Sequence, residues 1–261
     1  MPASQATLLI KKLVKTFPAG NQRIQALRGL SMQAHDSDFI AIMGPSGSGK
    51  STLLHCIAGL CQADTGEIYL DGKLLANNND RQMTALRRQK IGVIFQSFNL
   101  LPNLSVGDNI CLPIYADGKK VDKDKLYSLA KRLGIVDKLK RRPASLSGGE
   151  QQRAAIARTL LCEPSLILAD EPTGSLDSIA GNQFCELLRS LCEEEKRSIL
   201  LVTHEPSVAV WAKKVIVLHD GQKIGQLELP EQMPATELAH IYREIIADAP
   251  RFSATATMPT K

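Results

Sequence analysis

The chain has 261 residues, of which 44% are hydrophobic and 23% charged, so it is long and apolar enough for a full core and is not an intrinsically disordered chain. Its formal net charge of +5 is mild and spread out. The longest apolar runs, at 166–169 and 199–202, are far shorter than the roughly 20 residues of a membrane-spanning helix. Residues 1–12 lack the pattern of a secretory signal, and we therefore expect a cytosolic protein.

The cysteines form no C-x-x-C pair and have no histidine cluster nearby, which argues against a disulfide framework and a zinc site. Because their neighbours are mostly apolar, we expect small buried residues in a reducing compartment. They are Cys56, Cys61, Cys111, Cys162, Cys185 and Cys192. The densest basic cluster, at 138–142, would suit nucleic acid or an anionic membrane surface, but such a run more often forms a solvated helix end.

Apolar runs and turn residues predict an α/β fold. Strands are predicted at 8–10, 39–43, 66–72 and 91–95, with a short helix at 83–88. From 97 to about 157 the pattern becomes helical, most clearly at 123–133, and we expect an inserted helical subdomain there. The alternation resumes with strands at 166–169, 199–203 and 215–218 and a helix at 179–194. Strands that alternate with helices imply a mostly parallel, buried sheet.

A C-terminal extension, 226–261, follows the domain that we expect over 1–225. Its apolar residues recur at the spacing of one helical face and are Leu238, Ile241, Tyr242 and Ile245. This predicts one amphipathic helix, followed by a disordered end over 250–261. Packing of the helix on its own domain is the simpler interpretation, and binding of a partner is the alternative.

A glycine-rich segment lies between the predicted strand at 39–43 and a helix that starts at Thr52. Its residues are Gly44, Pro45, Ser46, Gly47, Ser48, Gly49, Lys50 and Ser51. In a strand–loop–helix of this kind, the backbone N–H groups and the helix N-terminus surround phosphates, the lysine reaches the terminal phosphates, and the hydroxyl of Ser51 can hold a magnesium ion. The segment therefore predicts a nucleoside triphosphate site; a surface turn with a solvated lysine is the alternative.

Two adjacent carboxylates, Asp170 and Glu171, follow the buried strand at 166–169. Because ligands of parallel sheets bind at the carboxyl ends of the strands, we expect the phosphate loop, Asp170 and His204 to meet there. One carboxylate can hold magnesium and the other can polarise the attacking water. The alternatives are an exposed acidic pair without a role and a structural histidine.

A second glycine-containing segment, 146–153, repeats the phosphate-binding pattern without a lysine. Ser147, Gly148 and Gly149 precede a helix predicted at 151–159, and backbone N–H groups of such a nest can meet a γ-phosphate. Periodicity alone predicts a helix cap at Ser147, and the serine can serve both purposes.

With these motifs in this order, the chain from 8 to about 225 resembles the ATP-binding cassette (ABC) family, the nucleotide-binding subunits of ABC transporters. The motifs are the Walker A loop at 44–51, the Q-loop at Gln96, the signature at 146–150, Walker B at 166–171, the D-loop at 175–177, the H-loop at His204 and the A-loop aromatic at Phe17. The signature ends in Glu150, where many family members carry glutamine. The fold implied is that of a P-loop NTPase, with a mostly parallel core sheet, an antiparallel β subdomain and a helical subdomain.

The resemblance also implies an active ATPase that works as a head-to-tail dimer, with a second copy as the expected partner. ATP would lie between the Walker A loop of one subunit, including Thr52, and the signature of the other. Phe17 would stack on adenine, for which a buried core position is the alternative. Ser147, Gly148 and Gly149 would complete the partner's site, and Asp177 would bridge the interface.

Family roles carry over to the remaining site residues. Lys50 and Ser51 would hold the phosphates and Mg²⁺, and Asp170 would support the metal. Gln96 would sense the metal and the attacking water. Glu171 would be the general base, and His204 would contact the γ-phosphate and orient Glu171.

Without a spanning helix, work on a membrane requires separate integral permease subunits, and the family places such cassettes at the cytoplasmic face of the inner or plasma membrane. The apolar stretch 95–102 would meet the permease, and the motifs look most like the lipoprotein-release and macrolide-export subgroup. A clamp on DNA or ribosomes is the alternative function, although we expect no nucleic acid. A GTPase or nucleotide kinase would leave the signature and His204 unexplained.

Overall fold

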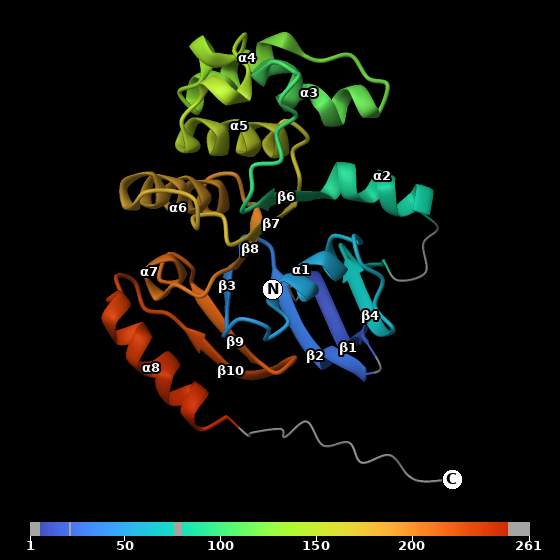
Figure 1. Cartoon of the computed structure of the whole chain (residues 1–261), viewed down its shortest axis with the longest axis vertical. Coiled ribbons are helices and arrows are strands. Elements are labelled where there is room, and N and C mark those ends of the chain that lie inside the picture. The colour runs from blue at the N-terminus through green and yellow to red at the C-terminus, as the bar shows by residue number, and fades with distance from the viewer. Residues whose placement is uncertain (1–5, 21, 76–79, 250–261) are drawn as a thin grey trace, which may run out of the picture.

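The computed structural model describes residues 6–20, 22–75 and 80–249, except for the side chains of 80–83 and 87. Two sheets form the body of the molecule (Figure 1). The first is antiparallel, with the order β2-β1-β4-β5. Its strands are β1 (Ala6–Ala19), β2 (Gln22–His35), β4 (Thr65–Leu70) and β5 (Lys73–Leu74).

The second sheet has the order β10-β9-β3-β8-β7-β6 and is parallel except for β10 at its edge. Its strands are β3 (Phe39–Met43), β6 (Ile91–Phe95), β7 (Leu166–Asp170), β8 (Ser198–Val202), β9 (Lys214–His219) and β10 (Gln222–Glu228). Every residue of β3 and β8 is buried, as expected for parallel strands that are covered on both faces. The predicted α/β class with a mostly parallel core sheet and an antiparallel β part is confirmed.

The helices lie at three levels in Figure 1: α3, α4 and α5 at one end, α6 between α5 and the parallel sheet, and α7 and α8 at the other end. The helices are α1 (Lys50–Ile57), α2 (Asp80–Lys90), α3 (Val106–Ala116), α4 (Lys123–Arg132), α5 (Gly148–Leu160), α6 (Ser178–Glu193), α7 (Pro206–Ala209) and α8 (Ala235–Ala247). Short 3-10 turns at Val136–Lys138 and Pro143–Ser145 connect α4 to α5.

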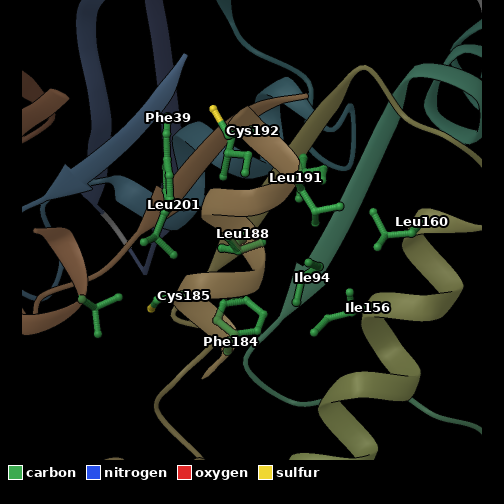
Figure 2. Packing of buried hydrophobic residues seen from close by; sticks show 14 of the residues in the cluster. Phe39, Ile94, Ile156, Leu160, Phe184, Cys185, Leu188, Leu191, Cys192 and Leu201 are labelled. Atoms are coloured by element: carbon green, nitrogen blue, oxygen red, sulfur yellow. The ribbon is translucent and has the colours of Figure 1, made fainter. Parts of the chain in front are cut away.

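Helix α6 links the parallel sheet to α5 through one continuous apolar cluster (Figure 2). Phe184, Leu188 and Leu191 of α6 are almost completely buried. Phe39, Ile94 and Leu201 of the sheet belong to the same cluster, as do Ile156 and Leu160 of α5. Because burying each large apolar side chain stabilises the fold by roughly 1.5–3 kcal/mol, this layer holds α5 against the parallel sheet.

Five of the helices and strands that the structure describes are not predicted by the sequence patterns: β2, β5, α3, α7 and β10. Half of the residues of β2 are exposed, and the strand pairs with β1 along the whole hairpin while its Leu27, Leu30, Met32 and Ala34 are buried. Helix α3 begins after Ser105, whose hydroxyl accepts from Asp108 N, and it includes Pro113. Edge strand β10 has no fully buried residue and crosses Gly225, so the segment after 225 begins within the sheet.

Helix α8 is the amphipathic helix predicted in the C-terminal extension. Its Leu238 is completely buried, and a side chain at Gly225 of β10 would meet Ile245 Cγ2 at 3.1 Å. The helix therefore packs on its own domain, beside α7 and β9. The disordered end predicted over 250–261 lies outside the described residues.

Candidate nucleotide site

The phosphate loop turns from β3 into α1, and at two of its glycines, Gly44 and Gly49, a side chain would clash with backbone. Gly49 is the N-cap of α1 with φ 97°, and a Cβ there would lie 2.3 Å from the carbonyl oxygen of Ala26 in β2. A Cβ at Gly44 would lie 2.3 Å from the carbonyl oxygen of Leu218 in β9. The loop thus fits closely between two strands, and its backbone N–H groups are held at the start of a helix, where anions bind.

Lys50 is buried inside this loop. Its Nζ donates to the carbonyl oxygens of Gly44 and Pro45, both at 2.9 Å. Burial lowers the pKa of Lys50, whereas the carboxylates of Glu171 and Asp170 act in the opposite direction. The cation is therefore poorly hydrated and positioned to attract an anion. A cavity of about 320 Å³ opens beside it, lined by Ala26, Ser46, Gly47, Gly49, Lys50, Ser51, Thr52 and Glu171.

Ser51, which lines this cavity, is hydrogen-bonded to Asp170 from another element. The Ser51 hydroxyl at the start of α1 donates to Asp170 Oδ1 at the end of β7, with a distance of 3.0 Å. Burial raises the pKa of Asp170, and the Ser51 hydrogen bond opposes that shift. His55, one turn after Ser51, lies 3.9 Å from the other carboxylate oxygen; sequence reasoning missed it, although the i, i+4 spacing to Ser51 was a signal.

These oxygen donors fit Mg²⁺, which binds through one or two carboxylates and the phosphates of its substrate. Ser51 and Asp170 supply a hydroxyl and a carboxylate oxygen 3.0 Å apart beside Lys50. The part of the chain that the structure describes holds no group of three or more His, Cys, Asp or Glu residues suited to a dedicated metal cage. The donor set therefore suits a metal that arrives with a nucleotide.

Glu171 and His204 form a second pair at the same edge of the sheet. His204 Nδ1 lies 3.3 Å from Glu171 Oε2. Glu171 adopts a left-handed backbone with φ 43°, and its N–H donates to the carbonyl oxygen of Val202 at 3.0 Å. Positive φ at a non-glycine residue is strained and is found preferentially at functional sites. The turn directs the Glu171 carboxylate to the cavity that Lys50 also lines.

Gln96 lies just after β6 and is exposed, against the turn that follows Glu171. Ser175 Oγ donates to the Gln96 carbonyl oxygen at 3.3 Å, and a Cβ at Gly174 would come within 2.8 Å of Gln96 Nε2. Glycine at 174 thus leaves room for the amide side chain. The residues that line the phosphate cavity do not include Gln96.

Ser147 is the N-cap of α5, which begins at Gly148 rather than at the predicted Gln151. Its Oγ accepts from Glu150 N at 3.3 Å, and Glu150 Oε2 accepts from Ser147 N at 2.8 Å. This reciprocal pair is a capping box, so the helix-cap prediction is confirmed. Lys138 Nζ lies 3.1 Å from Glu150, and both contacts lower the pKa of Glu150, the Ser147 N–H more than Lys138. A glutamate at this position therefore stabilises the start of the signature helix.

A separate open depression of about 380 Å³ lies at the signature. It is lined by Ser147, Gly148, Gly149, Arg153, Ser175, Leu176, Asp177, Ile179, Ala180 and Gln183. Asp177 caps α6, with Oδ1 accepting from Ala180 N at 2.8 Å. The structure thus brings Ser147, Gly149 and Asp177 together, but this depression shares no lining residue with the cavity at Lys50.

Phe17 lies near the tip of the β1–β2 hairpin and is 40% exposed, which contradicts the alternative of a buried core residue. It pairs across the strands with Ile24, and Lys15 Nζ lies 5.2 Å from the ring centroid. The exposed face of the ring is therefore accessible to a planar ligand.

The fold and this arrangement define an ABC-type nucleotide-binding cassette of the P-loop NTPase class. A family model described as ABC transporter matches residues 27–174, which is more than half of the chain, and the chain belongs to that family. This confirms the family and the fold predicted from the motifs. Among the described residues, no helix has the length and hydrophobicity to cross a membrane.

Curated relatives include "ABC transporter ATP-binding protein YxdL" of Bacillus subtilis, which is 40% identical over 222 residues covering 84% of this chain and 86% of the relative. "Macrolide export ATP-binding/permease protein MacB" of Syntrophobacter fumaroxidans is 41% identical over 216 residues, but this chain spans only 30% of its length. A solved structure entitled "Dimeric structure of a post-hydrolysis state of the ATP-binding cassette MJ0796 bound to ADP and Pi" is 36% identical, with a TM-score of 0.80 over 85% of this chain and 99% of that one. The relative named MJ0796 comes from Methanocaldococcus jannaschii.

Proposed function

We propose that this cassette hydrolyses ATP to ADP and phosphate between two copies arranged head to tail, and that it drives a separate integral membrane permease. The observation that carries the proposal is the separation of two phosphate-binding elements. The loop with Lys50 lines one depression and the nest at Ser147 lines another, with no residue in common. Each is half of a phosphate site, and a second subunit supplies the missing half. The dimeric structure of the MJ0796 cassette supports this arrangement.

In the proposed reaction, the loop N–H groups and Lys50 bind the β- and γ-phosphates. Ser51 and Asp170 hold Mg²⁺, which when bound neutralises charge on the phosphates, and Gln96 reaches the metal and the attacking water from the next strand. Glu171 accepts the proton of that water. His204 fixes the carboxylate of Glu171 and donates to the γ-phosphate. Phe17 stacks on the adenine.

The second subunit contributes its signature to the same ATP. The N–H groups at Gly148 and Gly149 donate to the γ-phosphate, Ser147 adds its hydroxyl, and Asp177 lies across the interface. Because hydrolysis requires residues of both subunits, one copy alone binds ATP without turning it over efficiently.

The permease is expected to dock on the apolar segment after Gln96, where Leu101 is 48% exposed. We propose that the cassette then lies at the cytoplasmic face of the inner or plasma membrane, with 1–225 as the ATPase domain, about 97–157 as its helical subdomain and 226–261 as an extension. The proposed role is export or lipoprotein extraction. The MacB relatives, whose names join ATP binding to a permease and to macrolide export, support the export role.

Trapping the ATP-bound dimer tests the enzymatic part of the proposal. In Glu171→Gln, ATP with Mg²⁺ is expected to shift the chain from monomer to dimer in light scattering, because ATP binds but is not cleaved. ADP, or ATP added to Glu171→Gln with Lys50→Ala, is the control and gives monomer. A Glu171→Gln chain that stays monomeric with bound ATP contradicts the shared site.

Copurification tests what the ATPase drives. Full-length chain recovered from detergent-treated membranes is expected to bring an integral membrane protein. Nucleic acid that dissociates as salt is raised would instead support the alternative, a clamp on DNA or ribosomes.

A further inference from the structure

Arg158 of α5 is hydrogen-bonded to the backbone just after the Q-loop. Its Nη1 donates to the carbonyl oxygen of Asn99 at 2.6 Å, and its Nη2 donates to that of Phe98 at 2.9 Å. These two carbonyls belong to the segment that leaves β6 and rises beside α5 towards α3 (Figure 1). Arg158 therefore joins the signature helix directly to the segment that follows Gln96.

The contact is not an ion pair, because both acceptors are backbone carbonyl groups. Within the described residues, Arg158 forms no ion pair, and burial lowers its pKa. A poorly hydrated guanidinium without an acidic partner lowers the stability of the folded state unless its N–H groups are hydrogen-bonded. The planar fork meets two successive carbonyl groups here, a geometry that the single ammonium of lysine cannot reproduce.

Asn109 of α3 holds the same segment from the other side. The residue is completely buried, and its Oδ1 accepts from Leu101 N at 2.6 Å. Its Nδ2 donates to the carbonyl oxygens of Leu101 at 3.0 Å and Ser105 at 2.9 Å. The segment 98–105 is thus tied to two helices, and it has little freedom to move independently of α5.

Because Arg158 lies on the helix that begins at the nest, its contact with the segment 98–102 can connect that segment to the nest. Ser147 caps one end of the helix, and Arg158 lies three turns later, about 16 Å along the axis at 1.5 Å per residue. A continuous α-helix of this length moves as a rigid rod. A displacement of the nest at Ser147 therefore reaches the carbonyls of Phe98 and Asn99 through the Arg158 side chain, in addition to the packing of the Phe98 ring near Gly148.

We propose that Arg158 is a positioning residue that couples the signature to the permease-facing segment 98–102. The inference rests on the proposed function, in which the nest at Ser147 meets the ATP of a second subunit. When the nest binds that ATP, α5 shifts, and the hydrogen bonds of Arg158 displace the segment 98–102 together with α5. Without Arg158, the nest still closes, but the carbonyls of Phe98 and Asn99 lose their direct link to α5 and the segment follows less closely.

Arg197 offers a matched control. Its Nη1 donates to the carbonyl oxygens of Glu163 at 3.1 Å and Pro164 at 2.9 Å, so it also ties a loop through successive carbonyls. That loop precedes β7, at the opposite end of the strand from Asp170. Arg197→Met removes a similar pair of hydrogen bonds, together with a 3.7 Å ion pair to Glu195, without touching the site or the segment 98–102.

The test is hydrogen exchange of the full chain in the Glu171→Gln background, with and without ATP. With Arg158 present, ATP is expected to slow exchange both at 147–152 and at 98–102. Arg158→Met should keep the response at 147–152 and lose it at 98–102 by about fivefold or more, whereas Arg197→Met keeps both. Arg158→Lys, which retains the charge and one donor group, should give an intermediate response at 98–102. This variant replaces Arg158→Met in the experiment if Arg158→Met folds poorly.

A full ATP response at 98–102 in Arg158→Met and Arg158→Lys overturns the proposal. If ATP produces no dimer, the proposed function is contradicted. The role of Arg158 can still be tested in that case, with the samples that contain no nucleotide. In those samples Arg158→Met must speed exchange at 98–102 relative to Arg197→Met. Equal exchange there means that Arg158 does not hold the segment, and the proposal fails on its own.

Discussion

The imidazole Nδ1 of His204 lies 3.3 Å from Oε2 of Glu171. The two residues meet because β7 and β8 are adjacent parallel strands, with Asp170 in register with Val202, so the residues that follow each strand emerge side by side. Lys50 and Glu171 line the same cavity. The general base proposed for this site is therefore oriented by a neighbouring strand rather than by its own flexible loop.

Replacing His204 with alanine should lower kcat by about 10- to 100-fold with little change in KM for ATP, because a positioned proton acceptor contributes roughly 10²–10⁴-fold and misorientation loses part of it. Steady-state ATPase assays measure both constants. His240 of α8 provides a matched control, since its Nδ1 lies 3.4 Å from Glu244 on an exposed surface. His240→Ala should retain wild-type turnover, and equal kcat in both variants would contradict the role of His204.

Replacing Phe17 with alanine should weaken ATP binding by about 5- to 10-fold, because an aromatic contact contributes roughly 0.5–1.5 kcal/mol beyond buried area. Phe17→Trp should restore the affinity. Equilibrium binding of ATP to the Glu171→Gln chain measures the effect without hydrolysis. Tyr127 of α4 is 56% exposed and outside the site, so Tyr127→Ala is the control. Unchanged affinity in Phe17→Ala would rule out adenine stacking.

Asp170→Asn should stabilise the nucleotide-free chain at pH 7 while it abolishes Mg²⁺-dependent hydrolysis. Burial raises the pKa of Asp170 above its ordinary value of 3.8, so the folded state retains a proton that the unfolded state releases. Stability from this group is therefore complete below the ordinary pKa and is lost as pH rises through the folded pKa. Asparagine does not ionise, so the variant does not lose stability as the pH rises.

Thermal unfolding at several pH values measures this effect. The Tm advantage of Asp170→Asn over the wild type should shrink as the pH is lowered towards the ordinary pKa. MgATP should raise the Tm of the wild type and have much less effect on the variant. A variant that is less stable than wild type at pH 7 would mean that ionised Asp170 stabilises the empty site.

Most residues of the proposed site could be predicted from the sequence because they lie in short, recognisable motifs. The loop at 44–51 and the carboxylates after 166–169 follow strands whose continuous apolar runs are visible in the sequence. The capping box at Ser147 is likewise local, since Ser147 and Glu150 are three residues apart. Such short-range patterns predict their own geometry.

What the sequence did not reveal depends on contacts between distant segments. Strand β2 pairs with β1 along the whole hairpin, and the need for glycine at 49 follows from the carbonyl of Ala26 in β2. The link from Arg158 to Phe98 joins segments 60 residues apart. No periodicity reports contacts of this kind, because they arise only when the layers pack.

The central claim, a site shared by two subunits, is tested most directly by mixing two inactive variants. Lys50→Ala removes the phosphate-binding lysine, and Ser147→Arg blocks the signature, so each homodimer is expected to be inactive. A head-to-tail mixed dimer keeps one site with Lys50 from one subunit and Ser147 from the other. Turnover in an equal mixture should recover to about a quarter of wild type, given random pairing with one intact site in two. Full activity of Ser147→Arg alone, or a mixture no more active than its components, would contradict the account.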